Sequence, residues 1–156
     1  MGRMYTAVFK SIAVTAQQDF FEVLAGTNKP IKVHAWSISQ STEVGDAQEE
    51  GLVLTCNRGV GSTTGSGGTV PTAAPLGVDD TACGATIEVN NTTKMTAGTI
   101  TELEDHVWNV RVPYMMIYTP ETRPYIKAGD RWTLELETTP ADSITVSGTI
   151  WFEEVS

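Results

Sequence analysis

Apolar and polar residues alternate most regularly in the last third of the chain. From residue 131 to 137, Trp132, Leu134 and Leu136 fall on one side of an extended chain, and the residues between them are polar. The alternation returns near the C-terminus on Ile144, Val146, Ile150 and Phe152. A period of two is typical of a strand with one buried and one exposed face. Because an antiparallel sheet must bury its apolar face against a second layer, these strands predict a β-sandwich.

Shorter runs of the same period precede these strands. They predict strands over residues 5–14, 31–39, 51–57, 86–89 and 107–118, the last interrupted at Pro113. Residues 99–105 are expected to hold one helical turn. Residues 15–25 fit an amphipathic helix through Phe20 and Leu24, or a strand through Phe21 and Val23, and we favour the strand because its surroundings have a period of two. Eight to ten strands without a βαβ unit predict an all-β chain, with one domain over residues 1–156.

The segment from about residue 59 to 76 contains mostly Gly, Ser, Thr and Pro. It has too few bulky apolar side chains to build a core of its own. Loops of this length inside a compact domain are usually binding loops or disordered segments. The sequence leaves both interpretations open.

The charge balance narrows the class of partner. The 156 residues include 19 acidic and 10 basic side chains, for a net charge of −9, and the basic residues are scattered. Binding to nucleic acid or to an anionic membrane depends on clustered Lys and Arg, so neither partner is expected. No secretion signal or apolar run of about 20 residues is recognisable, which predicts synthesis in the cytoplasm. There, Cys56 is expected to be a buried free thiol without a disulfide to Cys83.

Candidate chemistry is sparse. His106 follows Glu102, Glu104 and Asp105, a set that could bind zinc, but the spacing matches no known ligand pattern and we interpret it as a solvated acidic loop. The other histidine, His34, falls on the exposed side of its predicted strand. No nucleophile stands in a Gly-x-Ser-x-Gly context, and no glycine-rich turn leads into a helix. We therefore predict no catalytic residue, no cofactor and no metal ligand, and a protein that is not an enzyme.

Two tryptophans are candidates for an oligomer interface. Trp151 lies between Ile150 and Phe152, so alternation points its side chain away from the core. Alternation against Ile31, Val33 and Ala35 places Trp36 on the outer side as well. Exposed aromatic side chains are enriched at protein interfaces. We expect a partner subunit to cover Trp151 and Trp36.

Several segments together resemble a known family. They are residues 2–9, 13–22, 39–41, 58–68, 90–93, 108–110 and 141–149. In them the chain resembles a widespread family of small virion proteins of tailed bacteriophages, similar to capsid decoration, or cement, proteins. The resemblance implies a jelly-roll form of the β-sandwich, a homotrimer, and a place on the outer capsid surface of the virion with the major capsid protein as partner.

Two parts of the chain are candidates for contact with a capsid, since loops on a rigid sandwich commonly carry binding. One is the N-terminal segment with Arg3 and Tyr5, and the other is the long loop with Arg58 and Val60 at its start. The alternative function is a virion-associated module that binds a receptor or a carbohydrate, which outward tryptophans and a polar loop would also suit.

Overall fold

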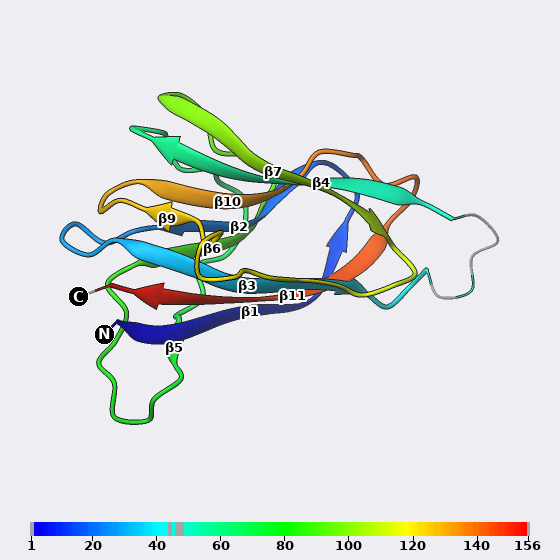
Figure 1. The fold of residues 1–156 in the computed structure, drawn as a ribbon. Coiled ribbons are helices and arrows are strands. Elements are labelled where there is room, and N and C mark those ends of the chain that lie inside the picture. The colour runs from blue at the N-terminus through cyan, green and yellow to red at the C-terminus, as the bar shows by residue number, and fades with distance from the viewer. Residues whose placement is uncertain (1, 44, 46–48, 156) are drawn as a thin grey trace.

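The computed structural model describes residues 2–43, 45 and 49–155 (Figure 1). Within them the chain forms strands and no helix, as the alternating pattern predicts. The strands are β1 (Arg3–Val14), β2 (Gln18–Leu24), β3 (Ile31–Gln40), β4 (Gly51–Val60), β5 (Ala74–Pro75), β6 (Thr86–Asn91), β7 (Thr99–Asn109), β8 (Tyr114–Ile117), β9 (Tyr125–Ile126), β10 (Arg131–Leu136) and β11 (Ile144–Glu154). In the described part of the chain no helix is long and apolar enough to cross a membrane.

The strands form two antiparallel sheets that pack against each other. Sheet A has the order β5-β1-β11-β3-β8, with β9 also paired to β3, and sheet B has the order β6-β2-β10-β4-β7. Without the short strands β5 and β9 and the outer strand β6, each sheet has four strands, and most connections pass from one sheet to the other. This strand order is that of a jelly roll. The predicted antiparallel, jelly-roll-like β-sandwich is confirmed.

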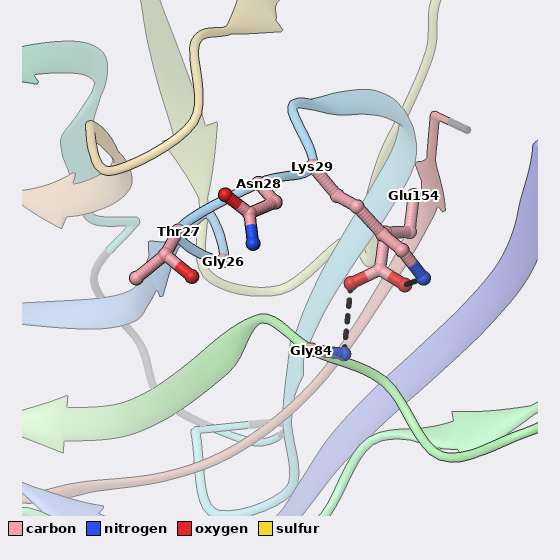
Figure 2. A pocket seen from close by; sticks show the side chains of 6 residues that line it. All are labelled: Gly26, Thr27, Asn28, Lys29, Gly84 and Glu154. Carbon is pink, nitrogen blue, oxygen red and sulfur yellow. Dashed lines mark hydrogen bonds and ion pairs between the residues drawn. The ribbon is translucent and has the colours of Figure 1, made fainter.

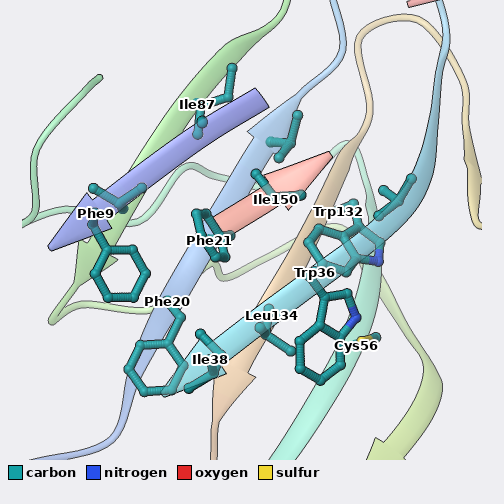
Figure 3. Packing of buried hydrophobic residues seen from close by; sticks show 14 of the residues in the cluster. Phe9, Phe20, Phe21, Trp36, Ile38, Cys56, Ile87, Trp132, Leu134 and Ile150 are labelled. Carbon is teal, nitrogen blue, oxygen red and sulfur yellow. The ribbon is translucent and has the colours of Figure 1, made fainter. Parts of the chain in front are cut away.

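The core lies between the inner faces of the sheets. The alternation predicted for the last two long strands is present, with Trp132, Leu134 and Leu136 of β10 fully buried. Figure 3 shows a group of aromatic rings at one end of this core, where Phe9 packs against Phe20 and Phe21. Burying one such side chain contributes roughly 1.5–3 kcal/mol, so this packing is the main stabilising term. Cys56 lies in the core as a free thiol, as predicted, and Cys83 is also free.

The helical turn predicted over residues 99–105 is wrong. These residues form the first part of β7, which pairs with β4 from Thr99 to Asn109. Glu104, His106 and Trp108 share one side of this strand and are more buried than the residues between them. The polar composition hid the period of two, because Glu104 and His106 stand at positions where an apolar residue is usual. The strand preferred for residues 15–25 is confirmed by β2.

The long Gly/Ser/Thr loop folds back over sheet B. Its backbone forms bridges to the next part of the chain, between Thr63 and Thr96, Ser66 and Thr93, and Thr69 and Val89. Glycine is required at the closest approach, since a Cβ on Gly68 would lie 2.0 Å from the carbonyl oxygen of Val89. The loop is therefore held by its own backbone hydrogen bonds, and the disordered alternative is not the one the chain adopts.

Candidate interaction surface

The outer face of sheet A exposes apolar side chains in two adjacent rows. Strand register places Thr6, Trp151, Ala35 and Ile117 side by side across β1, β11, β3 and β8. The next row consists of Val8, Thr149, Ser37 and Met115. Ile117, Met115 and Val8 are 69%, 57% and 56% exposed. We call these eight residues the sheet A surface. An apolar patch of this kind marks a site of interaction with another molecule.

A shallow groove of about 340 Å³ lies in this surface. Its lining residues are Met4, His34, Ala35, Met115, Ile117, Tyr118, Arg123 and Trp151. The short side chain of Ala35 stands between Trp151 and Ile117 in the same row, which leaves the depression. Arg123 contributes a cation, and its Nε is buried without a hydrogen-bond partner among the described residues. The groove can therefore hold an apolar side chain with an acceptor group beside it.

A polar pair adjoins the groove. His34 Nε2 lies 3.0 Å from Glu153 Oε2, and the backbone N–H of Gly2 donates to Glu153 Oε1 at 3.0 Å. Burial alone would raise the pKa of Glu153, but the hydrogen bonds from His34 and Gly2 outweigh it and lower the pKa below its usual value. The carboxylate is thus ionised at neutral pH, which gives the apolar groove a charged rim.

The structure separates the two predicted interface tryptophans. Trp151 is half-buried on the outer face of β11, on the side that alternation predicts. Trp36 is fully buried, so its prediction as an interface residue is wrong. In the pairing with β11, Trp151 faces Ala35 and Phe152 faces Val33, so His34 is an extra residue in β3. This β-bulge reverses the alternation beyond it and turns Trp36 into the core.

The four predicted capsid contacts also divide. The prediction that Tyr5 contacts the capsid is wrong, because its side chain is fully buried on the inner face of β1. There it stacks on Phe152 and donates its hydroxyl to the Thr81 carbonyl oxygen at 2.9 Å. Arg3 is exposed and forms a 3.3 Å ion pair with Asp80. Val60 is exposed and Arg58 is half-buried at the end of β4. These last three lie at the end of the sandwich where both termini emerge (Figure 1).

A small pocket of about 180 Å³ lies at the same end (Figure 2). Its buried carboxylate, Glu154, accepts the Gly84 N–H at 2.8 Å and pairs with Lys29 at 3.3 Å. The rest of the lining is Gly26, Thr27 and Asn28 of the β2–β3 turn. Since both oxygens of Glu154 have partners, the carboxylate ties this turn and the segment at Gly84 to the last strand. The geometry assigns the pocket a structural role.

Sequence reasoning missed a polar cluster in the core. Cys56 of β4 faces Glu104 of β7 across the sheet, and His106 follows two residues later on the same side. Glu102 and Asp105, which the sequence grouped with His106, do not belong to this cluster. The spacing Glu104-x-His106 on a strand was the only sequence signal for it. Burial raises the pKa of the Cys56 thiol to about 12, so the thiol is protonated and unreactive by itself.

Comparisons of this chain with protein-family models, with curated proteins and with solved structures give no significant match. The resemblance to phage virion proteins thus stays a prediction from the residues that carry it. The jelly roll rests on strand order and register alone.

Proposed function

We propose that this protein is a capsid decoration protein of a tailed bacteriophage, which binds the outer shell as a homotrimer and stabilises it. The observation that carries the proposal is the sheet A surface, an exposed face with apolar side chains around Trp151. A jelly roll is a frequent architecture of viral shell proteins. Fold alone does not establish function, so the proposal depends on this surface.

The two regions singled out above would have different tasks. The sheet A surface would join subunits, since aromatic and aliphatic side chains there gain most from burial. The end of the sandwich with Arg3, Arg58 and Val60 would face the capsid. A threefold assembly joins two different patches of each subunit and presents three copies of the capsid-binding end. Three weak contacts held together bind far more tightly than one.

Stabilisation of the shell would follow from mass action. A ligand that binds assembled capsid subunits, and not separated ones, favours the assembled state. The net charge of −9 directs the protein away from the packaged nucleic acid and toward a protein partner. The expected partners are the major capsid protein and further copies of this chain.

The first test is the mass of the full chain by native mass spectrometry, followed by co-sedimentation with empty shells assembled from the major capsid protein of the same phage. A trimer that saturates the shells and raises their melting temperature supports the proposal. A monomer or dimer overturns the trimer, and a protein that stays in the supernatant overturns the capsid function. Trp151→Ala should lose both trimer and pelleting, whereas Ser39→Ala, on the same outer face of sheet A but outside the groove, should keep both.

A carbohydrate-binding module is the second candidate, because Trp151 lies beside the hydrogen-bonding pair of His34 and Glu153. Aromatic faces next to polar groups suit sugar rings. Binding on a glycan array that Trp151→Ala abolishes, without binding to shells, would favour this function over the first.

A further inference from the structure

The two open edges of the jelly roll meet around a group of potential metal ligands. β7 is the last strand of sheet B and β8 the last strand of sheet A. Between them, the Cys56 sulfur, a Glu104 carboxylate oxygen and a His106 ring nitrogen all lie within 4.8 Å of one another. We propose that Cys56, Glu104 and His106 bind one zinc ion that closes this edge of the sandwich.

The donor set selects the metal. Zinc binds thiolate sulfur, imidazole nitrogen and carboxylate oxygen, usually in four-coordinate sites, whereas calcium and magnesium take oxygen ligands. The thiolate and the carboxylate together neutralise the two positive charges of zinc. When zinc binds, the sulfur–zinc bond replaces the sulfur–hydrogen bond of Cys56, and the proton leaves to solvent.

Strand geometry holds the three ligands in place before any metal arrives. Glu104 and His106 share the inner face of β7, and Cys56 is the register partner of Glu104 on β4. His106 Nε2 already lies 3.0 Å from Glu104 Oε2, so this nitrogen points into the cluster. A site on paired strands is more rigid than one on loops, which lowers the entropy lost on binding.

Further side chains orient the ligands. The Tyr114 hydroxyl lies 2.8 Å from His106 Nδ1 and can accept its N–H, so that Nε2 can bind the metal in place of its contact with Glu104. The Tyr118 hydroxyl accepts the Trp36 Nε1–H at 3.1 Å and donates to Glu104 Oε2 at 3.2 Å. Partners of this kind on the second nitrogen of a ligand histidine are a regular feature of metal sites.

A fourth ligand can come from solvent. A pocket of about 460 Å³ adjoins the cluster, and Glu104, His106, Met116, Tyr118 and Thr119 are part of its lining. Three protein ligands with one position open to a pocket leave room for a water molecule at the metal. The zinc site is thus accessible from the edge of the sandwich, although Cys56 itself lies in the core.

The test uses the full chain, stripped of metal by a chelator and titrated with zinc by calorimetry and with cobalt by absorption spectroscopy. We expect one metal per chain, a rise in melting temperature with zinc, and a thiolate-to-cobalt charge-transfer band. His106→Gln and Cys56→Ser should each lower zinc affinity by at least about 100-fold. Tyr114→Phe should lower it by about 10- to 100-fold while leaving all three ligands in place.

The chain supplies matched controls. His34 also lies 3.0 Å from a carboxylate, on the outer face, and Cys83 is the second free cysteine, near Glu154. His34→Gln and Cys83→Ser should bind zinc and cobalt like the wild type. If circular dichroism shows that the Cys56 variant does not fold, Glu104→Gln takes its place, because it removes a ligand and keeps the side-chain volume. No zinc uptake by the wild type, or a cobalt band that persists in Cys56→Ser, overturns the proposal and leaves a hydrogen-bonded polar cluster.

Discussion

Loops of the same chain cover part of the outer face of sheet B, over β2 and β10, whereas the sheet A surface is exposed. Over sheet B, the ion pair of Glu22 and Arg131 is almost fully buried, with 3.2 Å between Arg131 Nε and Glu22 Oε1. Glu22 also accepts the Gly65 N–H at 2.9 Å, and Asp19 accepts the Met95 N–H at 2.8 Å. Over sheet A the central rows consist of small, hydroxyl and apolar residues that remain in contact with solvent.

This difference shows what holds the loops over sheet B and what is missing on the sheet A surface. Buried carboxyl groups on sheet B accept hydrogen bonds from the backbone N–H groups of the loops. A loop poor in apolar side chains is thereby held in one place without a core of its own. The sheet A surface has exposed apolar side chains, and no loop among the described residues is held over it in this way, which suits it to contact with another molecule.

The largest effect is expected where the cover of sheet B depends on charge. Arg131→Met leaves Glu22 buried without its cation and removes the bonds from Arg131 to Thr64, at 2.7 and 3.0 Å. Breaking a buried pair typically destabilises a protein by about 3–5 kcal/mol. Urea unfolding at pH 7 measures this loss. The control, Arg3→Met, breaks an exposed pair with Asp80 and should change stability by about 1 kcal/mol or less. Equal effects of the two substitutions would contradict the conclusion that the buried pair holds the cover of sheet B.

The second effect depends on pH. Burial raises the pKa of the Asp19 carboxyl from 3.8 to about 7. The negative charges of the nearby Glu135 and Glu22 raise this pKa further, whereas the positive charge of Lys94 lowers it. Between about pH 4 and pH 7 the folded state keeps a proton that the unfolded chain has released. The free energy of unfolding therefore falls as the pH rises through this window, by up to about 4 kcal/mol, and levels off above it.

Asp19→Asn should flatten this slope, because an amide cannot titrate and its oxygen can still accept the Met95 N–H. Urea midpoints at pH 5 and pH 7 provide the measurement. The wild type should be clearly less stable at pH 7, and the variant should differ less between the two. Burial also raises the pKa of Glu22, so part of the slope should remain in the variant. Identical slopes in both proteins would show that Asp19 does not cause this pH dependence.

The third effect is steric. A Cβ on Gly65 would lie 2.3 Å from the Thr93 carbonyl oxygen, so Gly65→Ala forces the two loops apart. Overpacking of this kind costs about 1–3 kcal/mol. Gly45→Ala is the matched control, since no atom of the described residues lies within 4 Å of its Cβ position. Faster hydrogen exchange at Ser66 and Thr93 in the Gly65 variant would locate the damage, and unchanged exchange would show that the loop is not held as described.

The smallest effect on folding is expected on the sheet A surface. Ile117→Ser removes an exposed side chain and should shift the unfolding free energy of the separated subunit by about 0.5 kcal/mol or less. Its effect should appear in the oligomeric mass instead. A strong loss of stability in a subunit shown to be monomeric would mean that this face already packs against its own chain.

Much of the architecture was accessible from the sequence because strand alternation is local. Trp132 was placed in the core and Trp151 outside it, and both positions agree with the structure. The helical turn at 99–105 failed where polar residues occupy inward positions. Of the predicted capsid contacts, Tyr5 failed because the prediction relied on its place near the N-terminus rather than on the alternation of β1.

The sequence by itself determined that this chain forms alternating strands, hence two layers with a core between them. Only the tertiary structure decided which side of β3 holds Trp36, since a bulge depends on the neighbouring strand and reverses every residue beyond it. It also decided that Cys56 meets Glu104 and His106, some fifty residues away, and that the Gly/Ser/Thr loop covers sheet B. Contacts between distant segments follow from strand register, which no local pattern contains.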